Sequence, residues 1–566
     1  MTCRKLVAVT SFVLLATGAA FAQTSAADKA RTEDLIKQAL DRYNEGIQAA
    51  QVQSAQGPSG SSAVVGAGTV PLTLDEAVQR AADNNLDIVV EKLNPQTFDL
   101  SLAGLYAVYH PVATSRYGSQ ALIRLPNSLL NGGTRVNNDT LTYNGGVAKA
   151  FEWGGGNVAW SWNNSRLLSS DALATFNPQY QSTFQFVLTQ PLLKNFRIDS
   201  SRQLIQTTRI SRDTADLNLK ARTVNTLASV RSAYWDYVYS IQAVDVAQQS
   251  LALAQKLLSD NRVRVEVGTM APMDVVQAQA EVATRQQALT TATATMRTSE
   301  LAVKRLIVSG TNDPLWAQHV NPVDRPEFQP VTIDVESAVR SALQQRTDLQ
   351  ITRNNMASNN VLLKSFNDQK LPQVDLTATY GMQGIGGTQF QFQGSGVNAV
   401  KIGETPGGYS DALSRLFQRQ YPNKVFQINV TYPIGGSSAD ASAARQKLLI
   451  TQNQAQIRAS ELRVASDVTN AALTVQNGIE GLAAARAARE LSQQRLDAES
   501  SRFEVGMSTN YQVVQAQRDL RDAQNSELRA LLNYRKSLVE FDRVQQAGAA
   551  TGGTTTSAST TASQSQ

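Results

Sequence analysis

Two very long stretches without proline constrain this chain more than any other feature. The first runs from Asp199 to Val267 and contains neither glycine nor proline, and the second runs from Ser437 to Val505 and contains no proline. Proline inside a helix removes a hydrogen bond and clashes with the preceding turn, so its absence over such lengths predicts continuous helices. At about 1.5 Å per residue, each helix would be roughly 100 Å long. We therefore expect one elongated body rather than several globular domains.

Both stretches carry apolar residues at the spacing of a coiled coil. These residues recur at intervals of three, four or seven: Leu217, Val224, Leu227, Tyr234, Val238 and Ile241 in the first, and Ala465, Val468, Ala472, Val475, Ile479 and Leu482 in the second. Helices with this repeat pack side by side along an apolar seam. Each long helix is therefore predicted to have helical neighbours along its length.

A glycine ends each long helix, at Gly268 and at Gly506. Glycine adopts positive φ without steric cost, which lets the chain turn and return as a second helix. The returning helices are expected at about 273–309 and 507–546. Each is about half as long as its partner, so another helix must be stacked on its end. Two segments fit that role, each opened by an aspartate in an N-cap position: 74–103 and 334–367.

The chain also contains an internal duplication. Two pairs of segments match: 264–279 with 502–517, and 71–75 with 330–334. A repeated unit of this kind determines the architecture before any local pattern does. We predict two repeats, at 71–329 and 330–546.

Three segments between the helical blocks have a period of two. Their apolar positions are Phe184, Phe186 and Leu188 in the first, Val374, Leu376, Ala378 and Tyr380 in the second, and Phe426, Ile428, Val430 and Tyr432 in the third. The alternate positions are mostly Gln, Asn and Thr. This alternation is typical of a strand between lipid and a water-filled lumen.

Further strands are expected around these three. Residues 111–125 are predicted to form a fourth strand, although their alternation is poor. A hairpin over 141–151 and 158–162, turning at 154–156, fits either a longer barrel wall or an external excursion. Residues 384–408 are rich in glycine and are predicted to form a long loop.

The two ends of the sequence differ from the rest. Residues 1–22 have the layout of a cleavable secretory signal peptide, with two basic residues, an apolar run and a small-residue site ending at Ala22. Residues 23–70 are expected to hold a short amphipathic helix and a Gly/Ser linker. Residues 547–566 form a Ser/Thr/Ala/Gly tail that is predicted to be disordered.

Composition excludes several classes of function. The chain has 52 basic and 47 acidic residues without a basic block, which argues against binding to nucleic acid. The one cysteine, Cys3, lies in the predicted signal peptide, so disulfides, thiolate metal sites and a cysteine nucleophile are excluded from the mature chain. The two histidines, His110 and His319, lie far apart in the sequence. No catalytic residue, metal site or cofactor is predicted, and an enzyme is disfavoured.

Four strands cannot close a barrel, and a membrane-spanning sheet must leave no edge unpaired. Three chains would supply about twelve strands, which is enough for a water-filled lumen. The expected fold class is thus an α+β membrane channel, in which three chains form a twelve-stranded β-barrel.

From about Pro71 to Gln546 the chain resembles the TolC family of outer-membrane efflux proteins. The residues that carry the resemblance are the Val-Gly turns at 267–268 and 505–506, each followed by Val-Val-Gln-Ala-Gln, the strand exits at 190–193 and 432–436, and the helix opening at 74–77. The turns and the strand exits occur in both repeats. The resemblance implies a homotrimer in outer-membrane lipid, with a long α-helical barrel as its large periplasmic portion. It also implies docking to a periplasmic adaptor protein and an inner-membrane transporter, within an efflux or type I secretion system.

The resemblance assigns roles to residues near the helix turns. The adaptor-binding tips would be Val267, Gly268, Thr269, Val505, Gly506 and Met507, where the family carries Val-Gly-Leu. A periplasmic gate would involve Asp274, Gln512 and Gln515. A second interpretation of Asp274 is a solvated aspartate that the helix dipole favours.

The lipid-facing side of the barrel is expected to consist of Phe184, Phe186, Leu188, Phe426, Ile428, Val430 and Tyr432. The alternative to a channel is a structural coiled-coil protein of the cell envelope, for which the long helices would suffice. The interposed strands weigh against that alternative because a pure coiled coil does not need them.

Overall fold

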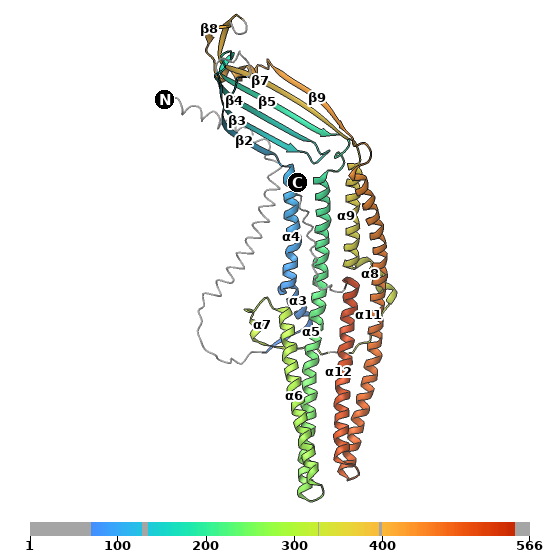
Figure 1. Ribbon diagram of the computed structural model, residues 1–566. Coiled ribbons are helices and arrows are strands. Elements are labelled where there is room, and N and C mark those ends of the chain that lie inside the picture. The colour runs from blue at the N-terminus through green and yellow to red at the C-terminus, as the bar shows by residue number, and fades with distance from the viewer. Residues whose placement is uncertain (1–68, 127–133, 326–327, 395–398, 549–566) are drawn as a thin grey trace, which may run out of the picture. The chain divides into compact units, whose positions relative to one another are not determined.

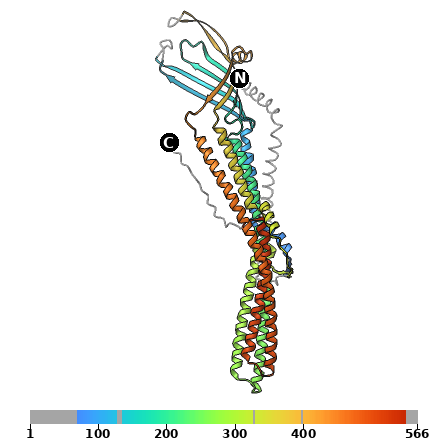
Figure 2. The same ribbon diagram turned by 90° about the vertical axis from the view of Figure 1, so that its right-hand side faces the viewer.

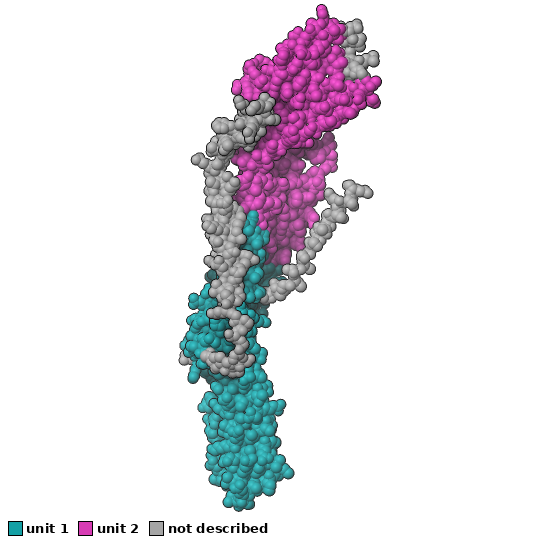
Figure 3. Space-filling model, turned by 90° about the vertical axis from the view of Figure 1, so that its left-hand side faces the viewer, with its two compact units in different colours: residues 1–100, 215–351, 459–566 teal, residues 101–214, 352–458 magenta. Residues whose placement is uncertain are grey.

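The computed structural model describes residues 69–126, 134–325, 328–394 and 399–548. These residues form two compact units (Figure 3). The second unit consists of Ser101–Thr214 and Thr352–Arg458, and the first contains the remaining described residues. The predicted signal peptide at 1–22, the extension at 23–70 except for its last two residues, and the tail at 547–566 except for its first two residues lie outside the described part of the chain.

The second unit is built around one antiparallel sheet of seven strands (Figure 1). In chain order the strands are β2 (Val112–Arg124), β3 (Val136–Ala150), β4 (Asn157–Ser169), β5 (Phe176–Pro191), β7 (Gln373–Gln393), β8 (Val400–Thr405) and β9 (Pro422–Thr431). Six strands lie side by side in the order β2-β3-β4-β5-β7-β9. Strand β8 pairs only with the last residues of β7, from Gln389 to Gln393, beyond the part of β7 that pairs with β9.

This sheet corrects the predicted number of four strands per chain. The strand predicted at 111–125 is confirmed as β2. The hairpin that the sequence left undecided forms β3 and β4, which pair with each other and insert between β2 and β5. Its pattern is weak in the sequence because Gly145 and Gly146 interrupt the alternation of β3.

The predicted loop at 384–408 is also corrected, because β7 and β8 occupy most of it. Helix α10 (Tyr409–Phe417) packs on β7, with Ala412 and Leu416 buried against the sheet. A Cβ atom added at Gly384 would lie 1.9 Å from the backbone oxygen of Ala412. Gly384 and Gly386 therefore reflect the close approach of a helix and a strand rather than a loop.

The long helices form as predicted. Helices α5 (Ser200–Glu266) and α11 (Ser438–Glu504) each contain 67 residues. Helices α6 (Pro272–Ile307) and α12 (Asn510–Gln546) return alongside them (Figure 1, Figure 2). The predicted bounds of these four helices are confirmed to within a few residues.

The two stacked segments are each interrupted, which the sequence analysis missed. The first divides into α3 (Leu74–Asn84) and α4 (Leu86–Tyr106), and the second into α8 (Val335–Gln345) and α9 (Thr347–Gln369). Asn85 stands at the first break, and its side-chain amide donates to the backbone oxygen of Leu306 in α6 (2.9 Å). Arg346 stands at the second break and donates to Asp467 of α11 (2.8 Å). Each break thus anchors a short helix to a long one.

The starts of these segments agree only in part with prediction. Asp334 caps α8, as expected, by accepting from the backbone N–H groups of Glu336 and Ser337. Helix α3 is capped by Thr73 instead of an aspartate, and the Thr73 side chain accepts from Glu76. Both residues satisfy backbone donors that the first helical turn leaves free.

Three apolar clusters hold the first unit together. The first includes Leu72, Val230, Tyr234, Trp235, Val303, Ile307 and Val320, the second includes Ala342, Val464, Val468, Val475, Tyr534 and Phe541, and the third includes Leu257, Leu496, Phe503, Val513, Val514, Ala516 and Leu520. The first cluster lies beside a parallel pair of short strands, β1 (Thr69–Leu72) and β6 (His319–Pro322). The remaining short elements are the 3-10 helix η1 (Ala107–Tyr109) and helix α7 (Pro314–Ala317).

Candidate functional site

One face of the sheet is apolar over its central strands. Strand side chains alternate between faces, and the register carries the face of Phe184 from β5 to β4, β7 and β9. Its apolar members are Val158, Trp160 and Trp162 of β4, Phe184, Phe186 and Leu188 of β5, Leu376, Ala378, Tyr380 and Met382 of β7, and Phe426, Ile428 and Val430 of β9. We call this surface the apolar face. Six of the seven residues predicted to face lipid lie on it, and the seventh, Tyr432, directly follows the last residue of β9.

The opposite face of the same strands carries hydroxyl and amide side chains. Its members include Thr142 and Asn144 of β3, Ser161, Asn163 and Ser165 of β4, Gln181, Thr183 and Gln185 of β5, Thr377 and Thr379 of β7, and Gln427 and Asn429 of β9. We call this surface the polar face. A sheet with one apolar and one polar face suits a wall between lipid and water.

The two helix turns have the same local geometry. At the first, the N–H of Gly268 donates to the Val265 carbonyl (3.0 Å) and the N–H of Thr269 donates to the Arg264 carbonyl (2.8 Å). At the second, Gly506 donates to Phe503 (3.2 Å) and Met507 to Arg502 (2.8 Å). This pair of bonds is the Schellman motif, which needs a residue with positive φ. The two glycines supply it, with φ of 77° and 79°.

Large apolar side chains around these turns are exposed. Four of them have between 69% and 74% of their surface in solvent: Val267, Met273, Val505 and Met507. The space around Gly268 and Gly506 is open, since a Cβ atom at either would meet no other group within 4 Å. Exposed apolar groups that gather on a surface mark a contact site for another molecule. The predicted tip residues therefore lie where a partner could reach them.

Polar contacts between the two helical hairpins lie on the tip side of the first unit, and the sequence analysis missed them. Arg518 of α12 donates to both carboxylate oxygens of Glu281 of α6, at 2.5 and 3.4 Å. Within α6, a guanidinium nitrogen of Arg285 lies 2.5 Å from Glu281. Nearby, the side-chain amide of Asn261 donates to the side-chain oxygen of Asn510 (2.9 Å). We call these three interactions the tip contacts.

The acid in the tip contacts is deeply buried. Glu281 is 5% exposed and Arg285 is 2% exposed, whereas Arg518 is half-exposed. Burial alone would raise the pKa of Glu281, but hydrogen bonds and charges from Arg518 and Arg285 outweigh burial and hold this pKa below its usual range. Glu281 is therefore a carboxylate at neutral pH. The spacing of Glu281 and Arg285 is visible in the sequence, but their burial is not.

The three predicted gate residues lie near the starts of the returning helices, Asp274 and Gln512 in the first turn and Gln515 in the second. Asp274 is half-buried in the first turn of α6. The Gln512 side-chain oxygen accepts from the Thr509 backbone N–H (3.0 Å), which makes it part of a capping box. The Gln515 amide donates to Asp519 (2.8 Å). The order Thr-x-x-Gln is a sequence signature of such a box, so the capping contact of Gln512 could have been predicted.

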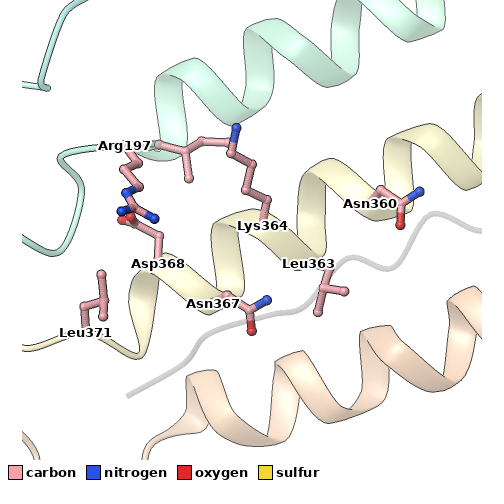
Figure 4. A pocket seen from close by; sticks show the side chains of 8 residues that line it. Arg197, Asn360, Leu363, Lys364, Asn367, Asp368 and Leu371 are labelled. Carbon is pink, nitrogen blue, oxygen red and sulfur yellow. The ribbon is translucent and has the colours of Figure 1, made fainter.

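A pocket of about 360 Å³ lies in the second unit, where the chain leaves β5 for α5 (Figure 4). Arg197 and Asp368 lie on the same side of it, and Lys364 lies nearby (Figure 4). Asp368 accepts a hydrogen bond from the backbone N–H of Asn195 (2.6 Å). Burial raises the pKa of Asp368, although the Asn195 N–H and the neighbouring arginines oppose this. The Asp368 carboxylate thus fixes the connection from strand to helix.

The described residues contain no group of three or more His, Cys, Asp or Glu side chains that could hold a metal ion. Among the two histidines, His319 is exposed and its ring nitrogen lies 3.3 Å from Glu300. Within the ranges that the structure describes, no helix has the length and hydropathy that crossing a membrane would require.

A two-faced antiparallel sheet on the same chain as two long helical hairpins defines the class of outer-membrane channels. Comparison with protein families agrees with this class: the model of the family "Outer membrane efflux protein" matches residues 155–308 and 338–544, which is more than half of the chain. The chain therefore belongs to the outer membrane efflux protein family. It is a protein of the outer membrane.

Solved structures of channels share the fold. The chain resembles the CmeC outer membrane channel of Campylobacter jejuni with 14% identity and a TM-score of 0.57, over 84% of this chain and 85% of that one. It resembles the outer membrane protein VceC of Vibrio cholerae with 13% identity and a TM-score of 0.58, over 84% and 96%. For the MtrE outer membrane channel of Neisseria gonorrhoeae the identity is 16% and the TM-score 0.55, over 84% and 89%. A search among curated proteins found no match in sequence.

Proposed function

We propose that three copies of this chain form an outer-membrane channel that passively conducts cargo delivered by an inner-membrane transporter through a periplasmic adaptor. One observation carries the proposal: a sheet with an apolar and a polar face is continuous in sequence with two long helical hairpins. The polar face would line a wet lumen, and the apolar face, together with Tyr432 just beyond the end of β9, would meet the bilayer. The helices of the first unit would form the periplasmic tunnel.

The homotrimer is supported by the edges of the sheet. Strands β2 and β9 each pair on one side alone in the described residues, and nearly all of their residues are exposed. Unpaired backbone donors and acceptors cost several kcal/mol each in lipid, so a single sheet cannot be stable there. Strands β2 and β9 of other copies can supply the missing hydrogen-bond partners.

The test of this function is the size and conductance of the purified protein. In detergent, light scattering should give the mass of three mature chains, and planar bilayers should show discrete conductance steps. The alternative, a structural coiled-coil protein of the envelope, would be extracted without detergent and would not conduct. A stable monomer with full strand content would contradict the channel.

We further propose that Val267, Gly268, Thr269, Val505, Gly506 and Met507 dock the periplasmic adaptor. The exposed apolar groups at both turns and the open space around the glycines support this role. Replacing both glycines by tryptophan should abolish export while trimers remain in the outer membrane, because a large side chain strains the turn and blocks the partner. Gly310→Trp is the matched control, since Gly310 also has open space around it and follows the opposite end of α6. Unchanged export in the double variant would remove the docking assignment.

We propose that Asp274, Gln512 and Gln515 contribute to a periplasmic constriction. Their place in the first two turns of α6 and α12, next to the tips, supports the assignment. Amides can hydrogen-bond across a constriction, but they cannot create the strong cation site of a carboxylate ring. Resting conductance should therefore be low and only weakly blocked by divalent cations.

Replacing Gln512 and Gln515 by aspartate tests the constriction. Aspartate is favourable near a helix N-terminus, so the double variant should fold. Three chains would then place six carboxylates around one axis, and divalent cations should block at lower concentration. If wild-type channels are already tightly blocked, or if the double variant is blocked no better, these glutamines do not line the constriction.

The proposed domain organisation has two repeats, at 71–329 and 330–546. The family model matches the chain twice, once within each of these ranges. The equal lengths of α5 and α11 also support a duplication. The inner-membrane transporter can be identified by crosslinking in the native envelope followed by mass spectrometry.

A further inference from the structure

The hairpin of β3 and β4 is continuous with the rest of the sheet. One row of paired residues crosses all six neighbouring strands: Ser115, Gly145, Trp162, Phe184, Met382 and Pro422. Each neighbouring pair in this row comes from an antiparallel ladder. The hairpin is therefore part of the wall and not an excursion from it.

The hairpin also continues both faces of the sheet. On the apolar face, Trp160 of β4 packs against Phe184 of β5 with their ring centroids 5.7 Å apart. Val147 of β3 pairs with Trp160 and extends this face by one more strand. On the other side, β3 and β4 carry hydroxyl and amide groups of the polar face. An excursion outside the barrel would not need two such faces in register with those of β5.

The turn of the hairpin lies at the same end of the sheet as the exit of β5. Gln190, next to the last residue of β5, donates its side-chain amide to the backbone oxygen of Gly154 (2.8 Å). A Cβ atom at Gly155 would lie 2.7 Å from the backbone oxygen of Asn195. Gly154 and Gly155 both have positive φ, which permits this close approach. The hairpin thus extends along the strands as far as the end of the sheet at which the chain leaves β5 for α5.

The two outer strands suit each other as partners. Antiparallel neighbours alternate in direction, and six is an even number, so β2 and β9 run in opposite directions. The free edge of β2 in one copy can therefore meet the free edge of β9 in the next copy as a further antiparallel pair. Their lengths of 13 and 10 residues are similar.

We infer that each chain contributes six strands to the membrane wall, so that three copies close an eighteen-stranded barrel through β2–β9 pairing between neighbours. This inference rests on the proposed homotrimer and replaces the twelve strands expected from four per chain. Because the diameter of a barrel grows roughly linearly with strand number, the lumen would be about one and a half times as wide as with twelve strands. Its lining of mostly neutral amide and hydroxyl groups would favour bulky hydrated cargo with little selection by charge.

Disulfide crosslinking tests the pairing, because the chain after the predicted signal peptide contains no cysteine. One cysteine is placed on β2, as Ser115→Cys or Ser119→Cys. The second is placed on β9, at one of the positions Lys424, Phe426, Ile428 and Val430, which lie on the same face of the sheet. Oxidation in membranes should join neighbouring chains into dimers and trimers on denaturing gels.

The matched control places the first cysteine on β4, as Trp160→Cys, with the same four β9 positions. Strand β4 is covered by β3 and β5, so no crosslink between chains is expected. If β4 crosslinks to β9, the wall contains four strands per chain and the inference is wrong. It is also wrong if purified trimers give no β2–β9 crosslink at any position. A mass other than three chains would instead overturn the proposed homotrimer, which separates the two failures.

Discussion

The buried ion pair of Glu281 and Arg285 gives a direct test of how the helix turns are held. Replacing Glu281 by leucine leaves the Arg285 guanidinium, which is 2% exposed, without its acid. Breaking a buried pair from one side costs about 3–5 kcal/mol, because a charge remains without compensation. The loss of the Arg518 bond adds little, since Arg518 is half-exposed and water can replace Glu281.

The double variant Glu281→Leu/Arg285→Leu separates burial from charge. Replacing both members of a buried pair by apolar residues is often neutral, so most of the lost stability should return. The two substitutions should therefore show a coupling energy of about 2–3 kcal/mol. Glu336→Leu is the control, because Glu336 and Arg340 have the same spacing but are 83% and 71% exposed. It should cost less than about 1 kcal/mol.

Native-state hydrogen exchange of the α6 amides measures these effects. A loss of about 3 kcal/mol corresponds to exchange that is roughly one hundred times faster. The reasoning is refuted if Glu281→Leu changes exchange no more than the Glu336 control does. It is also refuted if the free-energy losses of the two single variants simply add in the double variant.

The acid sensitivity of Glu281, a buried tyrosine and the close contact of α10 with β7 each allow a further prediction. The folded pKa of Glu281 lies below the ordinary value of 4.5, so the stability that Glu281 contributes is fully present above pH 4.5 and is lost as pH falls through the folded pKa. Hydrogen exchange of the α6 amides, corrected for intrinsic rates, should therefore accelerate only below pH 4.5, and acceleration already at pH 6 would contradict this. Tyr234→Phe removes the hydrogen bonds of the Tyr234 hydroxyl to the Leu72 backbone oxygen and to Asp324, and should lower the free energy of unfolding by about 1–3 kcal/mol. The thermal unfolding midpoint should fall accordingly, and an unchanged midpoint would show that these bonds are dispensable. Gly384→Ala should displace α10 from β7 and expose residues 409–417 to protease, because a Cβ atom at Gly384 would clash with the backbone of Ala412. Gly381→Ala is the control, since a Cβ atom there lies 3.5 Å from its nearest neighbour, and equal cleavage of the two variants would argue against the close helix–strand approach.

The long helices could be predicted because their signals are local. The absence of proline and the apolar spacing of α5 and α11 are features of the sequence itself, and the glycines at both turns mark where they end. The interruptions at Asn85 and Arg346 could not be predicted in the same way. Each depends on a contact with a helix far away in the sequence, to Leu306 in one case and to Asp467 in the other.

The sheet and the turns show a similar division. Strands β5, β7 and β9 alternate cleanly, so their faces were predictable, whereas β3 carries two glycines and becomes recognisable only through its ladders to β2 and β4. The exposed groups at the turns were also predictable from position. The pairing of Glu281 with Arg518 was not, because it depends on which faces of α6 and α12 meet, and helical periodicity does not determine that.

The identical Schellman motifs at Gly268 and Gly506 have a consequence for how this channel could change its partners. Each turn is completed by two backbone bonds within six consecutive residues, but the residues after the two glycines differ in their contacts. The Thr269 hydroxyl donates a further hydrogen bond to the Arg264 carbonyl (2.9 Å), whereas Met507 is 74% exposed and contributes only its backbone to the two bonds. A new docking specificity could therefore be acquired by substitution at Met507 without loss of the turn, whereas substitution of Thr269 would also remove a hydrogen bond at the end of α5.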